Sequence, residues 1–95
     1  MEKAWNELLE KKNIRENLSR MRQLIKEDLG REYLEGRLIE SPETLFSLLQ
    51  DEDAKSRRNA ALLLGDLEWE DAVEALWEAY CQETTLFVRS AYLTA

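Results

Sequence analysis

Three arginines at matching positions are the residues of this chain best suited to binding an anion. Arg57 and Arg89 lie 32 residues apart in two similar segments, and Arg15 holds the matching place in a third. A guanidinium group binds phosphate or carboxylate through parallel hydrogen bonds, so the three could hold a phosphate or a carboxylate-rich peptide. In the alternative, structural interpretation, acids of the preceding turn pair with them: Asp51 or Asp53 with Arg57, and Glu83 with Arg89.

A second basic set could bind nucleic acid. Arg15, Arg22 and Lys26, together with Ser19, form a stripe along one face of an expected helix. Acidic neighbours at positions 16 and 27 neutralise part of this charge, and no aromatic side chain on the stripe could stack on a base. A solvated helix face is the favoured interpretation. The alternative, a nucleic-acid-binding function, would use Arg15, Arg22, Lys26, Arg57 and Arg58.

The residue types of common catalytic and metal sites are missing or badly placed. The chain has no His, the commonest acid/base catalyst and metal ligand, so Cys81 has no imidazole to activate it. Glu70, Glu74 and Glu78 are expected on the side of a helix opposite Trp77, as a solvated outer face or, in the alternative, a surface for a basic partner. A row along one helix cannot converge on one ion. The acidic turn at 51–53 is too short for a calcium loop. We therefore expect no catalytic, metal or cofactor site and no enzymatic activity in this segment.

Composition indicates one folded domain. The 95 residues are 44% hydrophobic and 35% charged, and the longest apolar run, 60–64, is too short to span a membrane. The N-terminus carries no secretory signal and Cys81 is alone, which predicts a cytoplasmic protein. Residues 1–40 carry nine bases and nine acids, whereas residues 41–95 carry four bases and eleven acids. The net charge of −7 therefore lies in the second part, which should repel phosphate backbones.

Nearly the whole chain is predicted to be helical, because Gly and Pro are rare and no alternating strand pattern persists. The expected helices cover about 2–11, 14–29, 42–50, 54–64, 70–82 and 86–95. Asn13 and Asp53 are expected to cap two of them, and Gly30 and Gly65 to end two. Residues 31–40 are expected to form an insertion or a short helix broken near Gly36.

An internal repeat organises the second part of the chain. Residues 45–67 are echoed 32 residues later by residues 77–95. A repeat of this kind is typical of a stacked array of helical pairs that share one core. In this register Leu45 corresponds to Trp77 and Leu49 to Cys81, so Trp77 and Cys81 are predicted to be buried. The buried face expected on residues 70–82 comprises Val73, Leu76, Trp77 and Tyr80.

Residues 43–95 resemble a HEAT repeat, in the short bacterial form also found in phycobilisome lyase-like proteins. Paired leucines end a first helix, an acidic turn follows, and a second helix begins with a small residue and Arg and closes with Leu-Gly. The matching residues are Leu48, Leu49, Asp51, Asp53, Arg57, Ala60, Ala61, Leu64 and Gly65. Ser56 departs from the usual Val, which Val88 restores in the next unit. The resemblance implies an all-α, α-α superhelix of about three antiparallel helix pairs, over units 2–29, 42–66 and 70–95, with structural arginines.

The resemblance implies a non-catalytic protein–protein interaction scaffold that contacts its partner through the second helices. The candidate contact residues are Arg22, Arg58, Leu62, Ser90 and Thr94. The last unit stops before its own Leu-Gly, so the sequence looks like the N-terminal part of a longer array, truncated at its C-terminus, whose exposed end could self-associate. The alternatives are a nucleic-acid-binding HEAT-like module and an accessory domain of a larger enzyme such as a methyltransferase.

Overall fold

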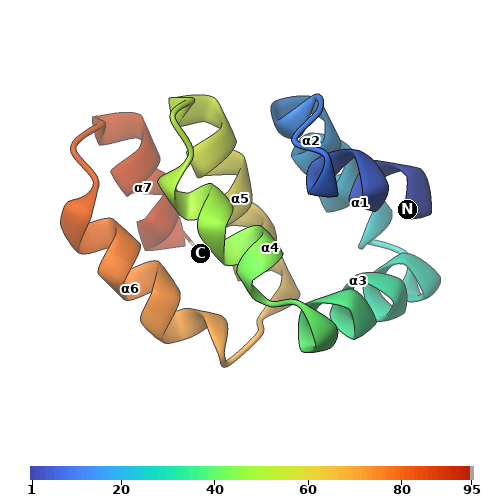
Figure 1. Cartoon of the computed structure of the whole chain (residues 1–95). Coiled ribbons are helices and arrows are strands. Elements are labelled where there is room, and N and C mark those ends of the chain that lie inside the picture. The colour runs from blue at the N-terminus through green and yellow to red at the C-terminus, as the bar shows by residue number, and fades with distance from the viewer. Residues whose placement is uncertain (95) are drawn as a thin grey trace.

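A computed structural model describes residues 1–94 as helices joined by short turns (Figure 1). Helices make up 78% of the chain, and no strand occurs within residues 1–94, so the all-α prediction is confirmed. The elements are α1 (Glu2–Leu9), α2 (Ile14–Leu24), α3 (Asp28–Glu40), α4 (Glu43–Phe46), the 3₁₀ helix η1 (Ser47–Gln50), α5 (Ala54–Leu67), α6 (Ala72–Gln82) and α7 (Leu86–Thr94).

Helix α5 lies at the centre of the molecule. It packs against α2 on one side and α7 on the other, so that α2, α5 and α7 form a row (Figure 1). Each member of the row contacts the helix that precedes it across a short turn: α1 contacts α2, η1 contacts α5, and α6 contacts α7. Helix α3 connects α2 to α4 and contacts both. Within residues 1–94 we call α1 with α2, α4 and η1 with α5, and α6 with α7 the first, second and third helical pairs, and α3 lies between the first and the second.

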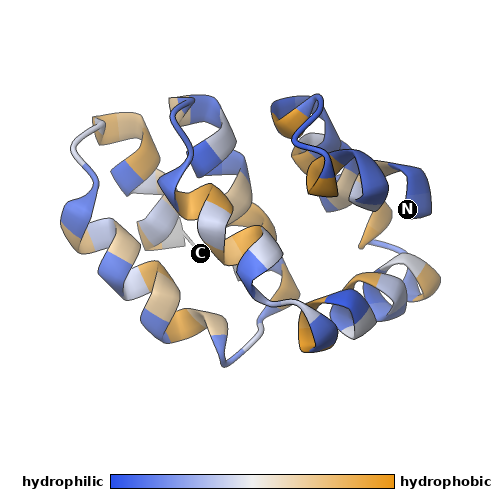
Figure 2. Cartoon of the chain, in the orientation of Figure 1, coloured by the Kyte–Doolittle hydropathy of each residue, from blue (hydrophilic) through white to orange (hydrophobic). Residues whose placement is uncertain are grey.

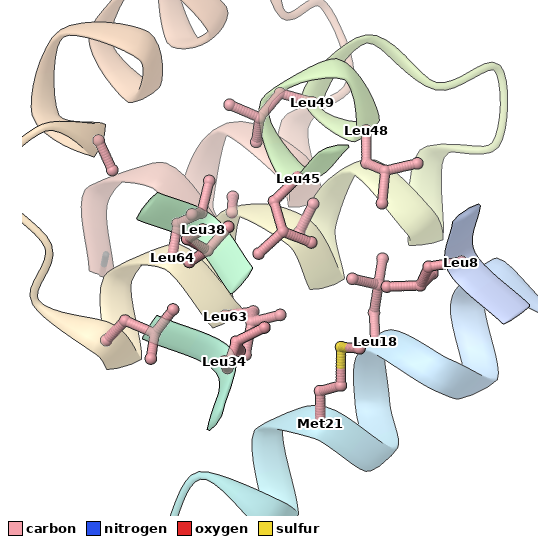
Figure 3. Close-up of a cluster of buried hydrophobic side chains, with 14 of the residues drawn as sticks. Leu8, Leu18, Met21, Leu34, Leu38, Leu45, Leu48, Leu49, Leu63 and Leu64 are labelled. Carbon is pink, nitrogen blue, oxygen red and sulfur yellow. The ribbon is translucent and has the colours of Figure 1, made fainter. Parts of the chain in front are cut away.

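Leucines from most of these helices meet in one core (Figure 3). Its most deeply buried large side chains are Leu18, Met21, Leu34, Leu38, Leu45, Leu63, Leu64 and Val88. Truncating one such leucine to Ala costs about 2–5 kcal/mol, because it removes apolar contacts and leaves a cavity. Since Leu34 and Leu38 come from α3, this helix contributes to the folded core.

Helix α3 also corrects two expectations about glycine. Gly30 was expected to end the second helix, and a break was expected near Gly36, but α2 ends at Leu24 and α3 runs through both glycines. Neither adopts positive φ. A Cβ on Gly30 would meet the carbonyl oxygen of Leu24. This glycine therefore lets the first turn of α3 approach the end of α2, a role in close approach rather than in helix termination.

The predicted start of α5 is confirmed, and its predicted end is wrong. Asp53 caps the helix by accepting hydrogen bonds from the Ser56 N–H at 3.0 Å and the Ser56 hydroxyl at 2.9 Å. The helix continues past Gly65 and ends where Glu68 adopts a left-handed conformation. Asn13 precedes α2 as predicted, but its side chain makes no capping hydrogen bond.

Helix α6 buries a different face from the one predicted. Its fully buried residues are Ala72 and Ala79, whereas Val73 and Trp77 are each 65% exposed and Cys81 is exposed. The prediction that Val73, Trp77 and Cys81 belong to the core is therefore wrong. Leu76 and Tyr80, from the same predicted face, are partly buried against the core.

The difference between the predicted and the observed buried face of α6 has a geometric cause. In the preceding pair the first helix is a single turn of α4 followed by the 3₁₀ helix η1, and this segment buries Leu45 and Leu48. A 3₁₀ helix has three residues per turn, whereas α6 is a regular α-helix with 3.6, so equal sequence spacing does not select the same face. The small side chains of Ala72 and Ala79 allow α6 to pack closely by an adjacent face, which still includes Leu76.

Surface hydropathy is uneven along the row of helices. Figure 2 shows hydrophilic residues at the turn before α5 and hydrophobic residues at the start of α7. Helix α7 packs through Val88, Ala91 and Tyr92, while Leu86 and Phe87 remain exposed. Among the described residues, no helix has the length and apolar character needed to cross a bilayer.

Candidate functional site

Arg15 connects the first helical pair to the second. From the first turn of α2, its Nε and Nη2 atoms donate hydrogen bonds to the two carboxylate oxygens of Asp53, at 3.2 and 3.0 Å. Hydrogen bonds from Arg15 and Ser56 hold the pKa of the Asp53 carboxyl below its ordinary value of 3.8, although desolvation acts in the opposite direction. Both side chains of the ion pair are exposed, so its contribution to stability is small.

Arg57 forms the equivalent but better shielded connection between the second and third pairs. Its Nε and Nη2 atoms donate to the carboxylate of Glu83 at 2.9 and 3.2 Å, and its Nη1 atom donates to the carbonyl oxygens of Asp51 and Glu52. The side chains are 18% and 5% exposed for Arg57 and Glu83. Glu83 also accepts the Thr85 N–H at 3.1 Å. We call these two ion pairs, Arg15–Asp53 and Arg57–Glu83, the clamps.

Charge and burial act against each other on Glu83. Burial raises the pKa of this carboxyl, but the hydrogen bonds from Arg57 and from the Thr85 backbone outweigh it and hold the pKa below 4.5. The hydrogen bond to Glu83 in turn raises the pKa of Arg57, so both groups remain charged at neutral pH. The structural interpretation of the arginines is therefore right for Arg15 and Arg57, whose donors are used within the fold.

The partners of the arginines differ from those predicted. Asp53 pairs with Arg15 of the preceding pair and not with Arg57, which contacts Asp51 only through its carbonyl oxygen. Arg89 was expected to pair with Glu83, but Glu83 is taken by Arg57. The Arg89 guanidinium lies instead over the Tyr80 ring, 4.7 Å from its centroid, in a cation–π contact.

The basic stripe on α2 is partly neutralised by the fold. Arg22 donates to Asp66 at 2.9 Å and Arg15 is held in its clamp, whereas Lys26 donates to the uncharged Gln23 at 3.1 Å and keeps its charge. These contacts leave less free positive charge on α2 than the sequence alone suggested. They disfavour an extended contact with a phosphate backbone.

The candidate contact residues on the second helices differ in accessibility. Arg58 and Ser90 are exposed, whereas Arg22 is partly buried beside Asp66. Leu62 is only 8% exposed, so it offers little surface to a partner. The side chain of Thr94 lies outside the described residues. These positions therefore do not make a continuous apolar surface.

A sizeable hollow of the described surface lies elsewhere, beside α6. A groove of about 390 Å³ runs between the end of α5, α6 and α7. We call it the α6–α7 groove, and its lining residues are Leu64, Gly65, Glu68, Trp69, Glu70, Val73, Leu76, Trp77, Tyr80, Tyr92 and Leu93. Its lining is mostly apolar and includes four aromatic rings, which is the usual character of a site that binds apolar groups.

Aromatic contacts hold the wall of this groove in place. Trp77 stacks on Tyr80 with 5.7 Å between ring centroids, and Tyr80 meets Tyr92 edge-on at 6.3 Å. The face of Trp69 packs on Phe46 at 5.6 Å, which attaches the α5–α6 turn to the core. Val73 and Trp77 nevertheless remain 65% exposed. The groove therefore combines supported rings with accessible apolar surface.

The end of α5 that closes the groove is fixed from α3. Arg31 donates to the carbonyl oxygens of Leu67 and Asp66 at 3.0 and 2.8 Å. These carbonyls belong to the last turn of α5, where no further helical N–H is available to them. Arg31 thus caps α5 immediately before the turn that begins the groove.

Sequence reasoning missed this groove because it assigned Val73 and Trp77 to the core. One signal was present. Ala72 and Ala79 are seven residues apart, so they share a face that can pack closely, and Val73 and Trp77 lie away from it. The place of Leu93 on the groove depends on how α7 packs and has no local signal in the sequence.

Within residues 1–94, no group of three or more His, Cys, Asp or Glu side chains is arranged to hold a metal ion. Comparison with protein families, with curated proteins and with solved structures finds no match for this chain.

Proposed function

We propose that this chain is a non-catalytic protein–protein interaction scaffold, built as an α-α superhelix of HEAT-like helix pairs, that binds a partner in the α6–α7 groove. The observation that carries the proposal is the groove itself, with Val73, Trp77 and Leu93 exposed on supported aromatic walls. Soluble proteins rarely leave such apolar surface uncovered unless something binds to it. The single Cys81 fits a reducing compartment, and we place the protein in the cytoplasm.

Two features support the repeat architecture. The row α2, α5 and α7 consists of the second helices of the three pairs. Consecutive pairs are joined by the two clamps, each running from an arginine near the start of one second helix to an acid of the following pair. A contact that recurs between successive units is what a stacked array requires, because each unit packs only on its neighbours.

The test is a selection for ligands followed by substitution of the groove. A displayed peptide library of unbiased charge is selected against the whole chain, and isothermal titration calorimetry measures the affinity of the selected peptides. The double variant Val73→Ser/Trp77→Ser removes apolar surface, so affinity should fall at least about tenfold. Both side chains are exposed, so the melting temperature by circular dichroism should change little.

A matched control carries the same kind of change on another surface. Leu29→Ser/Ile39→Ser removes two exposed apolar side chains from α3 and should leave the affinity unchanged. The proposal fails if the selection yields no ligand. It also fails if the selected peptides bind the groove variant as tightly as they bind the unmodified chain.

A further inference from the structure

The rim of the α6–α7 groove carries acidic charge that the fold does not neutralise. From Asp66 to Glu83 the chain has seven acids and no base. Arg22 and Arg57 pair with the first and last of these, Asp66 and Glu83. The other five form no ion pair within the described residues, and we call them the acidic rim: Glu68, Glu70, Asp71, Glu74 and Glu78.

The acidic rim lies beside the apolar lining. Glu68 and Glu70 themselves line the groove. Along α6, Glu74 follows Val73 and Glu78 follows Trp77, and each step of one residue turns the helix by about 100°. A stripe of carboxylates therefore runs parallel to the apolar stripe of α6, along its outer edge, and not on the side of the helix opposite Trp77 where it was expected. A ligand seated on Val73 and Trp77 would have carboxylates next to it along the length of the helix.

We propose that the α6–α7 groove binds a cationic amphipathic helix, an inference that rests on the proposed function. Apolar side chains of the ligand helix, spaced three and four residues apart, pack on Val73, Trp77 and Leu93. Lys or Arg side chains on the adjacent face meet the acidic rim. Docking of a helix in an apolar groove is the recognition mode that fits a site between two helices.

Charge disfavours the other occupants. A second copy of this chain carries the same net charge of −7 and the same acidic rim. Placing two such rims against each other brings like charges within the Debye length of about 8–10 Å, where they repel. The surface of an anionic membrane would be repelled for the same reason. The same negative potential that repels a second copy or an anionic membrane attracts a cationic partner.

The experiment compares two model peptides that differ only in charge. Each is a helix of about 14–18 residues with Leu and Trp at helical spacing, and the remaining positions hold Lys in one peptide and Glu in its twin. Titration calorimetry against the whole chain should show that the Lys peptide binds at least about tenfold more tightly than the Glu peptide. Raising NaCl from about 50 to about 300 mM should lower the affinity of the Lys peptide and reduce the difference in affinity between the two peptides.

Substitution of the rim provides the second measurement. The variant Glu70→Gln/Glu74→Gln/Glu78→Gln should bind the Lys peptide about tenfold more weakly. Its affinity for the Glu peptide should stay the same or rise slightly. Its control, Glu16→Gln/Glu32→Gln/Glu43→Gln, changes the net charge equally on α2, α3 and α4, and should weaken the Lys peptide far less. Equal effects of the two triple variants would show a general charge effect and overturn the assignment of the rim.

The outcomes separate this inference from the proposed function. If both peptides bind equally and Val73→Ser/Trp77→Ser weakens both, the groove binds apolar helices and the cationic assignment is wrong. If neither binds and the unbiased library also yields no ligand, the proposed function fails as well. Concentration-dependent dimers in sedimentation velocity that the groove variant abolishes would identify a second copy as the occupant and overturn the inference.

Discussion

Arg57→Ala should destabilise this protein far more than the same change at its neighbour Arg58. The Arg57 guanidinium neutralises Glu83, whose side chain is only 5% exposed, and binds two carbonyl oxygens of the turn before α5. Deleting one member of a fully buried ion pair costs about 3–5 kcal/mol, because an uncompensated charge stays behind. Arg57 keeps 18% exposure and water reaches part of the site, so we expect about 2–3 kcal/mol.

That loss is large for a domain of this size. A chain of 95 residues has a free energy of unfolding of about 5–14 kcal/mol, so Arg57→Ala should lower the melting temperature by about 10–20 °C. Urea denaturation followed by far-ultraviolet circular dichroism measures the change. Arg58 is exposed and serves as the control, since Arg58→Ala should stay within about 0.5 kcal/mol of the unmodified protein.

A double variant tests the stated cause. Arg57→Met with Glu83→Leu removes both charges, so it should be less destabilised than Arg57→Ala although it deletes more hydrogen bonds. The reasoning is refuted if Arg57→Ala and Arg58→Ala unfold with the same free energy. It is also refuted if the double variant is the less stable of the two Arg57 variants, since the loss would then not come from an unpaired Glu83.

Three further outcomes follow from the same structure. The folded pKa of Glu83 lies below 4.5, so the stability that its carboxylate contributes is complete above that pH and is lost as the pH falls through the folded pKa. The urea midpoint of the unmodified protein should therefore drop in acid. The midpoint of Arg57→Ala should drop less over the same pH range. Burial raises the pKa of Tyr92 from 10.0 to about 12, so stability should be lost as the pH rises through this interval, and Tyr92→Phe should remove that loss in an alkaline denaturation series. Gly30→Ala should lower the melting temperature because its Cβ meets a carbonyl oxygen, whereas Gly36→Ala should raise stability by about 0.5–1 kcal/mol, because space is open there in mid-helix.

The features that sequence predicted well depend on local signals or on the second helices. Asp53 was identified as a cap because its side chain reaches an N–H only three residues away. In the 32-residue register Ser56 is aligned with Val88 and Ala60 with Tyr92, and all four residues are buried in the structure. These positions keep their face because α5 and α7 are regular helices in the same row.

The features that sequence missed depend on geometry between units. The register failed on α6, where Ala72 and Ala79 pack inward and Trp77 points away, because the segment it was matched to is partly 3₁₀. The partner of Arg57 is 26 residues away, in the next pair, and no local spacing indicates it. The groove was missed because of the first of these errors, since it exists only where α6 leaves Val73 and Trp77 exposed.

The placement of charge on α6 argues that this helix is selected for something other than stability. Glu74 and Glu78 are four residues apart and repel, and no base on α6 relieves them. Glu78→Lys would replace this repulsion with a favourable pair between Glu74 and the introduced lysine, and should raise the free energy of unfolding by about 0.5 kcal/mol. The same change reverses the charge at one point of the acidic rim, so it should lower the affinity for the Lys peptide while it stabilises the protein. If Glu78→Lys raises the free energy of unfolding but lowers the affinity for the Lys peptide, the acidic rim is retained at a cost in stability, as is common for binding surfaces. If Glu78→Lys leaves the affinity for the Lys peptide unchanged, the outer end of the rim takes no part in binding.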